Sequence, residues 1–350
     1  MSPNAPLRRP LHGAPAAGQH RRSASPHAVQ VTDLIRDFGS PRAPIRAVDN
    51  LDLQVHTGEI YGFLGPNGAG KTTLVRILTT LLRPTSGSAL VAGYDVVRQA
   101  DDVRRSIGVA LQEAAIDPLM TGRELLRMQG ALHGLRGAPA RERATSLLDR
   151  VGLTEAGDRR VGGYSGGMRR RLDLALALVH RPVVLFLDEP TTGLDPTSRA
   201  ALWREVRSLN DEGTTVFLTT QYLEEAEQLA DRVGIIAGGR LVAEGTPTDL
   251  KARVGEPTLH IELTDPQAAP SAREALAGLG ALEPPSPQAP TRLALRSGAG
   301  KGAIAPAVQA LQAAGVQVES VEVENPSLDD VFAAVTGSTL EGAAAESSAA

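Results

Sequence analysis

Apolar and polar positions follow a regular order from the start of the folded chain. Residues 29–35 and 48–55 alternate between the two, as half-buried strands do, and residues 60–64 form a short apolar run. Helical spacing comes next, with apolar residues at Leu74, Ile77, Leu78 and Leu81. This spacing predicts a helix from about residue 71 to Arg83, because the residue before Pro84 is restricted.

The alternation of strand and helix continues through the next part of the chain. Short apolar runs predict further strands at residues 107–111, 183–187, 215–218 and 233–236. Helical spacing predicts helices at residues 121–135, 139–151, 165–180, 198–209 and 224–229. Strands that alternate with helices predict an α/β fold, in which a mostly parallel sheet is covered on both faces.

The pattern changes near residue 255. Shorter strands and helices alternate from there, at residues 259–263, 270–277, 293–295, 304–314, 316–323 and 328–335. They predict a small α+β extension. The predicted organisation is a disordered N-terminal arm, a main domain, this extension and a disordered tail, at residues 1–27, 28–253, 254–337 and 338–350.

Composition narrows the class of protein. The 350 residues include no cysteine, which excludes disulfides and thiolate metal sites. A net charge of −4 gives no reason to expect nucleic acid as a partner. The sequence lacks a run of the roughly 18 apolar residues that cross a bilayer, and its first residues lack the apolar segment of a secretory signal. The chain by itself is expected to be soluble.

A glycine-rich loop joins the apolar run at residues 60–64 to the predicted helix. It reads Gly65-Pro66-Asn67-Gly68-Ala69-Gly70-Lys71-Thr72, which matches G-x-x-x-x-G-K-[ST] between a strand and a helix. Its glycines allow backbone amides to converge on phosphate oxygens, and the helix start adds the positive end of a dipole. Lys71 would contact the β- and γ-phosphates of ATP, and the Thr72 hydroxyl would bind Mg²⁺. A plain glycine turn is the alternative, but Lys71 is one of only three lysines.

Two carboxylates follow the apolar strand predicted at residues 183–187. Asp188 ends a buried run and needs a partner there, which Mg²⁺ bound through water would supply. Glu189 comes next and is the best placed general base to polarise the attacking water. A solvated acidic turn before Pro190 is the other interpretation, and the apolar run before Asp188 argues against it.

The segment Tyr164-Ser165-Gly166-Gly167-Met168 precedes an arginine-rich helix. The Ser165 hydroxyl and the amides of Gly166 and Gly167 would form a second anion site at the helix start. Ser-Gly-Gly is equally common in ordinary loops. The arginines at positions 169–171 are, for the most part, interpreted as a solvated helix face.

In their order and spacing, these motifs resemble the ATPase cassette of ABC transporters over roughly residues 28–250. The resemblance implies a P-loop NTPase fold in which an antiparallel β subdomain and a helical subdomain accompany the parallel core. It also implies that two cassettes pair head to tail. Each ATP would then lie between the glycine loop of one copy and Ser165, Gly166 and Gly167 of the other.

The resemblance assigns roles to residues outside the three motifs. Gln112 would bind Mg²⁺ or the lytic water, and Asp195 would couple the two ATP sites of a dimer. Phe38 would stack on adenine, with a core aromatic as the alternative. The ATP-binding set that the resemblance implies also includes Val48 and Thr73.

Two departures from the family pattern point to a subgroup. Tyr164 and Met168 flank Ser-Gly-Gly, where the family usually has leucine and glutamine. Gln221 stands where a histidine usually follows the strand, and glutamine cannot titrate, so Glu189 is expected to carry catalysis with Lys71 and Gln221. These features resemble daunorubicin-resistance-type exporter ATPases, as does Pro-Ser-Leu-Asp-Asp-Val-Phe at residues 326–332. This last segment is either a regulatory or assembly element or a plain Ser-capped helix.

The resemblance implies an ATP-hydrolysing subunit that powers efflux of hydrophobic drugs or antibiotics through a separate membrane permease. Its cofactors would be ATP and Mg²⁺, and its partners a second copy of itself and the permease, which would dock near residues 113–135. The chain would then lie on the cytoplasmic face of the cell membrane. A soluble ABC ATPase of translation or repair and an importer ATPase are the alternatives. A single cassette without a long coiled coil disfavours the soluble class.

Overall fold

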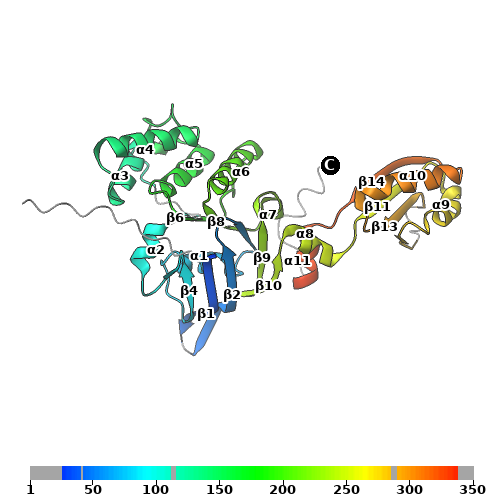
Figure 1. The fold of residues 1–350 in the computed structure, drawn as a ribbon, viewed down its shortest axis with the longest axis horizontal. Coiled ribbons are helices and arrows are strands. Elements are labelled where there is room, and N and C mark those ends of the chain that lie inside the picture. Colours follow the sequence, from blue (N-terminus) through cyan, green and yellow to red (C-terminus); the bar gives the residue numbers. More distant parts are fainter. Residues whose placement is uncertain (1–25, 41, 112–115, 285–289, 338–350) are drawn as a thin grey trace, which may run out of the picture.

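The computed structural model describes residues 26–40, 42–111, 116–284 and 290–337. They form a central sheet, an antiparallel sheet beside it, and a smaller sheet near the C-terminal end of the chain (Figure 1). Gln112, the predicted tail and nearly all of the predicted N-terminal arm lie outside the described residues.

The central sheet has six strands in the order β10-β9-β3-β8-β7-β6. They are β3 (Ile60–Leu64), β6 (Ile107–Ala110), β7 (Val184–Asp188), β8 (Thr215–Thr220), β9 (Arg232–Ala237) and β10 (Arg240–Gly245). Neighbours pair in parallel except β9 and β10, which form a hairpin through Gly238 and Gly239, both with positive φ. The predicted mostly parallel sheet is confirmed, and β10 is an antiparallel edge that the apolar runs do not predict.

The two faces of the central sheet pack against different layers. Phe217 on β8 packs with Tyr61 and Phe63 in a core that includes α1 and the antiparallel sheet. Val216 and Leu218 belong to the core on the other face, which includes residues of α5 and α6. Successive residues of a strand point to opposite faces, so β8 is apolar throughout instead of alternating.

The antiparallel sheet has the order β2-β1-β4-β5. Its strands are β1 (His27–Ser40), β2 (Ala43–His56), β4 (Ser86–Val91) and β5 (Tyr94–Asp95), and the helices next to it are α1 (Lys71–Leu78) and α2 (Ala100–Ser106). The prediction that the first helix extends to Arg83 is wrong. Thr80 takes a left-handed φ of 67°, which no helix continues through, and Leu81 is 62% exposed.

Three helices form an arm on the other side of the central sheet (Figure 1). They are α3 (Gly122–Leu132), α4 (Gly137–Arg150) and α5 (Gly166–Ala177), with a 3₁₀ turn at Val161–Gly163. A capping box between Thr121 and Glu124 starts α3. Helices α6 (Pro196–Asp211) and α7 (Leu223–Leu229) follow β7 and β8.

The C-terminal sheet is a separate α+β unit with its own core. Its strands β11 (Thr258–Leu263), β12 (Ala281–Leu282), β13 (Arg292–Arg296) and β14 (Val318–Glu324) pair antiparallel in the order β12-β13-β11-β14. Two helices, α9 (Ala269–Leu276) and α10 (Ile304–Ala313), and 3₁₀ turns at Pro266–Ala268 and Gly300–Ala303 connect them. Leu259, Ile261 and Leu263 alternate into the core formed with α9 and α10.

The last helix returns to the main domain. Helix α11 (Leu328–Thr336) packs against α7, α8 (Pro247–Val254) and β10. Its residues Leu328, Val331 and Phe332 are buried in one cluster with Ala226 and Leu250. The sequence pattern assigns this helix to the extension, whereas the structure places its apolar face in the core of the main domain.

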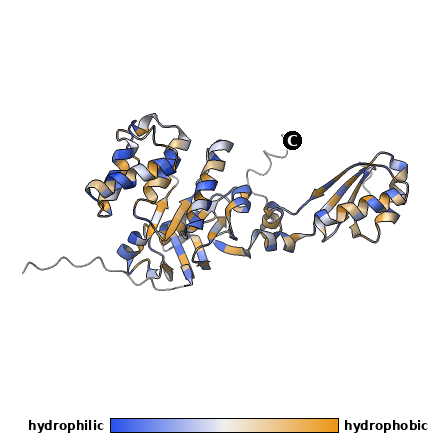
Figure 2. Cartoon of the chain, turned by 45° about the horizontal axis from the view of Figure 1, so that its top comes forward, coloured by the Kyte–Doolittle hydropathy of each residue, from blue (hydrophilic) through white to orange (hydrophobic). Residues whose placement is uncertain are grey.

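Hydropathy follows these layers. Figure 2 shows the most apolar residues along the central strands, while polar residues alternate along the helices of the arm. Among the described residues, no helix has both the length and the apolar character needed to span a bilayer.

Candidate nucleotide site

The glycine-rich loop connects the end of β3 to the start of α1. Gly70 has a φ of 110°, and a Cβ there would lie 2.3 Å from the Ala47 carbonyl oxygen, so only glycine fits. The Gly65 amide donates to the Thr220 carbonyl at 3.3 Å, which holds the loop to the end of β8. The backbone therefore curls at a helix N-terminus, the arrangement that binds phosphate.

Lys71 and Glu189 meet under this loop. The Lys71 side chain is 4% exposed, and its ammonium donates to the carbonyls of Gly65 at 2.7 Å and Pro66 at 3.1 Å. It also lies 3.4 Å from Glu189 Oε1. Burial lowers the pKa of Lys71, and the charge of Glu189 opposes that effect. Glu189 has a φ of 48°, a strained value for a residue with a side chain and one that is common at functional sites.

Asp188 offers an unsatisfied oxygen at the same edge. Its Oδ1 accepts a hydrogen bond from Thr219 Oγ1 at 2.5 Å and lies 3.4 Å from Thr72 Oγ1. Its Oδ2 is buried and has no hydrogen-bond partner within the described residues. Leaving such an oxygen unpaired is costly, and a hydrated Mg²⁺ held by Thr72 and Asp188 would satisfy it.

A cation at this position would need more ligands than the chain supplies. Within the described ranges, no three His, Cys, Asp or Glu side chains cluster as a metal site. Phosphate oxygens and water would complete an octahedral shell around Mg²⁺. The residues present therefore fit magnesium together with a nucleotide, and not a metal bound by protein alone.

Gln221 follows β8 at the same edge of the sheet. The two residues before it, Thr219 and Thr220, are fully buried. Thr219 Oγ1 accepts from the Glu189 amide at 3.2 Å, and the Thr220 carbonyl holds Gly65. Gln221 is half-buried. It directly follows Thr219, which is bonded to the carboxylate segment, and Thr220, which is bonded to the loop.

Ser165, Gly166 and Gly167 open α5 at the molecular surface. Ser165 caps the helix by accepting from the Met168 amide at 3.2 Å, which leaves its hydroxyl proton available. Ser165 and Gly166 are exposed, and a Cβ on Gly166 would meet no atom within 4 Å. The predicted anion site therefore faces outward, where a second molecule can reach it.

Asp195 is also exposed, and its carboxylate accepts hydrogen bonds from its own chain. It caps α6 by accepting from the Ser198 amide at 3.0 Å and from the Ser198 hydroxyl at 2.6 Å. These hydrogen bonds from Ser198 lower the pKa of Asp195. The predicted coupling role adds to this capping role and stays a prediction.

Phe38, Val48 and Thr73, the other residues of the predicted ATP-binding set, differ in their solvent exposure. Phe38 is 38% exposed, and the Arg36 guanidinium lies 4.5 Å from the centre of its ring. A ring with this exposure can be reached by a ligand, and its stacking on adenine stays a prediction. Val48 has no exposed surface and belongs to the core beneath the loop, so the structure gives its side chain a packing role. Thr73 is half-buried in the first turn of α1.

The interpretation of residues 169–171 as a solvated face is wrong for Arg170. Its side chain is 14% exposed and donates to backbone carbonyls at the ends of β6 and β7. The only sequence signal for this burial is Asp173, three residues later on the same helix face, which lies 3.5 Å away. Carbonyl acceptors carry no such signal, because every residue has one.

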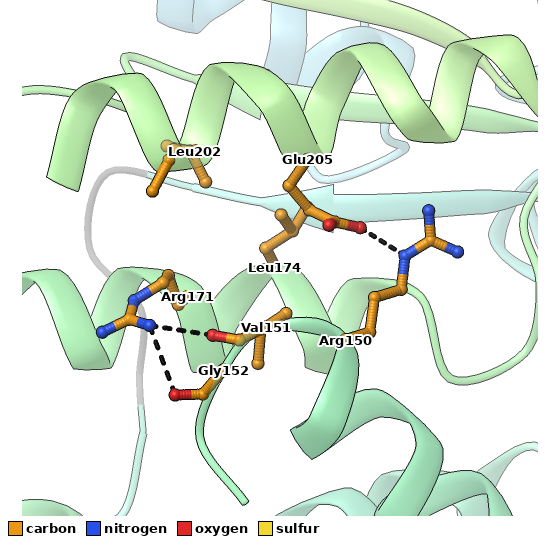
Figure 3. Close-up of a pocket in the computed structure, with 8 residues that line it drawn as sticks. Arg150, Val151, Gly152, Arg171, Leu174, Leu202 and Glu205 are labelled. Atoms are coloured by element: carbon orange, nitrogen blue, oxygen red, sulfur yellow. Dashed lines mark hydrogen bonds and ion pairs between the residues drawn. The ribbon is translucent and has the colours of Figure 1, made fainter. Parts of the chain in front are cut away.

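Arg171 points elsewhere, to the joint between the arm and the core. A pocket of about 190 Å³ lies there between α4, α5 and α6 (Figure 3). Arg171 donates to the Val151 carbonyl at 2.9 Å, and Arg150 pairs with Glu205 and Glu212. Both arginines are satisfied by the chain itself, so this pocket is a structural joint and not an anion site.

Comparison with known proteins identifies the family. The family model described as ABC transporter matches residues 48–192, which include the loop, the Ser165 segment and both carboxylates. The daunorubicin resistance ATP-binding protein DrrA2 of Streptomyces coeruleorubidus is 47% identical over 323 residues, 92% of this chain and 99% of that protein. The chain belongs to the daunorubicin-resistance type of ABC transporter ATP-binding proteins. As a member of this ATPase family, it binds and hydrolyses ATP.

Two further comparisons agree with this assignment. The daunorubicin/doxorubicin resistance ATP-binding protein DrrA of Streptomyces peucetius is 46% identical, over 92% of this chain and 96% of that protein. A solved structure of the cassette MJ0796, a dimer in a post-hydrolysis state bound to ADP and phosphate, is 26% identical with a TM-score of 0.58. It covers 62% of this chain and 98% of that one. The predicted ABC cassette fold is therefore confirmed.

Proposed function

We propose that this ATPase drives the export of hydrophobic drugs or antibiotics through a separate membrane permease. The observation that carries the proposal is the meeting of Lys71, Asp188 and Glu189 at one edge of the sheet, beneath a phosphate-binding loop. Similarity along nearly the whole chain to proteins named for daunorubicin and doxorubicin resistance supports drugs as the transported class.

In this proposal each residue of the edge has a role toward ATP. The loop amides and the Lys71 ammonium bind the β- and γ-phosphates, while Thr72 and Asp188 hold hydrated Mg²⁺. When bound, Mg²⁺ neutralises charge on the transferred phosphoryl group. Glu189 accepts a proton from the attacking water, and Gln221 orients that water through its amide. Phe38 and Thr73 contact the nucleotide, and the role of Gln112 stays a prediction.

Each complete site would need two copies of the chain. Ser165 and Gly166 are exposed and Gly167 is half-buried beside them, and this segment would offer a hydroxyl and helix N-terminal amides to an anion. A second chain, paired head to tail, would supply that anion as the γ-phosphate on its own loop. Asp195, exposed at the start of α6, would connect the two sites. The dimeric state described for MJ0796 supports this arrangement.

The arm offers a surface for the permease. Leu119, Met128 and Leu132, before and on α3, are 71%, 46% and 75% exposed. Exposed apolar side chains of this size, close together in sequence, are typical of contact surfaces. Docking there would hold the ATPase at the cytoplasmic face of the membrane and would transmit the closing of the dimer to the permease.

The test is ATP-dependent dimerisation of Glu189→Gln. This change keeps the shape of the side chain but removes the base, so bound ATP should persist between two chains. Light scattering with MgATP is expected to show a dimer that retains ATP. The matched control, Lys71→Ala in the Glu189→Gln chain, should stay monomeric. A Glu189→Gln chain that stays monomeric at saturating ATP would contradict the shared site.

A further inference from the structure

Arg170 extends from α5 to two other backbone segments, at Leu111 and at residues 188–190. Its Nη1 donates to the Leu111 carbonyl at 2.7 Å, just after the end of β6. Its Nη2 donates to the carbonyls of Asp188 at 2.7 Å and Glu189 at 3.0 Å. Its Nε donates to the Pro190 carbonyl at 2.8 Å. One guanidinium therefore holds both catalytic carboxylate residues by their backbone.

The Arg170 guanidinium is mostly buried. Burial lowers the pKa of Arg170, and the nearby Asp173 is the largest influence that opposes it. A buried charge is retained only where its hydrogen bonds are satisfied, and four carbonyls satisfy this one. Lysine could not replace it, because an ammonium lacks the planar fork that reaches several acceptors at once.

We propose that Arg170 is a positioning residue that fixes the Ser165–Gly167 segment relative to Asp188 and Glu189. Arg170 stands one helical turn after Gly166, the first residue of α5. The proposal rests on the shared-site function, in which these two segments of one chain serve different ATP molecules. Arg170 then sets the spacing between the two half-sites that each chain contributes to a dimer.

Its neighbour shows that α5 is held from both sides. Arg171 donates to the Val151 and Gly152 carbonyls at the end of α4, as Figure 3 shows. Arg170 binds α5 to the catalytic edge, and Arg171 binds it to the end of α4. Two adjacent arginines therefore connect α4 to the carboxylate segment through α5.

Loss of the Arg170 fork should affect turnover more than nucleotide binding. Lys71 and Thr72 bind ATP through contacts that do not include Arg170, so binding to the loop should persist. The signature segment and Glu189 would lose their common anchor, and a misplacement of about 1 Å near a reacting group costs roughly 100-fold in rate.

The experiment compares Arg170→Lys and Arg170→Met with Arg169→Met in the full chain. Arg169 is exposed on the same helix, and its side chain donates to the Tyr164 carbonyl at 3.3 Å. We expect both Arg170 variants to lower kcat roughly 10- to 100-fold with little change in KM for ATP. In the Glu189→Gln background, Arg170→Lys should still bind ATP but should no longer dimerise. Arg169→Met should match the parent chain in every assay.

Two results would overturn the proposal. One is wild-type kcat in both Arg170 variants. The other is a loss of kcat with an equal loss of ATP binding and a lower unfolding temperature, which indicates general damage to the fold. Failure of Glu189→Gln itself to dimerise, with Arg170 intact, would instead count against the shared site. In that case the kinetics of the Arg170 variants would still test whether Arg170 positions Glu189 within one chain: a lower kcat with an unchanged KM for ATP would support that role.

Discussion

At the scale of single residues, α5 carries a buried pair, Arg170 and Asp173, in which burial shifts both pKa values against the charged form. Asp173 lies 3.5 Å from Arg170, yet burial raises the pKa of Asp173 to about 7, and Arg170 only partly opposes the effect. Burial also lowers the pKa of Arg170. Loss of hydration therefore outweighs the attraction between the two side chains, as is common for ion pairs taken out of water.

The raised pKa of Asp173 predicts a pH-dependent stability. Between about pH 4 and pH 7 the folded chain holds this proton while the unfolded chain releases it, so the contribution of Asp173 to the free energy of unfolding falls as the pH rises. Asp173→Asn removes that titration. We expect the stability of wild type relative to the variant to decrease across this window, measured by urea unfolding at several pH values. Parallel curves for the two proteins would contradict this account of the site.

At the scale of elements, α11 makes the stability of the main domain depend on the end of the chain. Phe332 is 1% exposed and packs with residues of α7, α8 and β9. Phe332→Ala should cost about 3–5 kcal/mol of unfolding free energy, because it leaves a cavity in that cluster. Val335→Ala, on the same helix but 40% exposed, is the matched control and should cost little. Hydrogen exchange should accelerate in α7 and α8, and acceleration confined to α11 would contradict the packing argument.

The elements also show where sequence patterns succeed. Buried strands have simple patterns, and β3 (Ile60–Leu64) begins and ends where its apolar run does. No residue of the edge strand β10 is fully buried, so no apolar run marks this strand. The apolar face of α11 is predictable, but not its partner, because such a face fits any apolar core.

The residues of the nucleotide site also differ in whether the sequence predicts them. The loop at residues 65–72 is predictable because adjacent residues supply its amides, ammonium and hydroxyl. Asp188 and Glu189 are predictable from the buried strand before them. The role of Arg170 is not predictable, because its acceptors are carbonyls of residues distant in sequence. Local chemistry can be recognised in a sequence, while contacts between distant backbone segments require the fold.

At the scale of the whole molecule, the two halves of the proposed ATP site belong to different packing units. Helix α1, which follows the phosphate loop, packs against β2, β4 and β7, whereas α5, which follows Ser165, packs against β6, α3 and α4. In Figure 1 the two helices lie on opposite sides of the central sheet. A head-to-tail dimer brings the loop of one chain to the signature segment of the other, so defects in different halves should complement each other.

Mixing two defective chains tests this directly. Lys71→Ala disables the loop, and Gly166→Glu places a charge that repels phosphate at a position with room for a side chain. Each variant alone should retain no ATP in the Glu189→Gln background. Neither variant has an intact site with its own kind, so neither should dimerise alone, and the dimers of an equal mixture should be mixed, each with one intact site. Up to about half of the sites of the Glu189→Gln parent should then retain ATP. The control mixture, Lys71→Ala with the double variant Lys71→Ala/Gly166→Glu, contains no intact site and should retain none. Equal retention in the two mixtures would mean that each chain builds its ATP site alone.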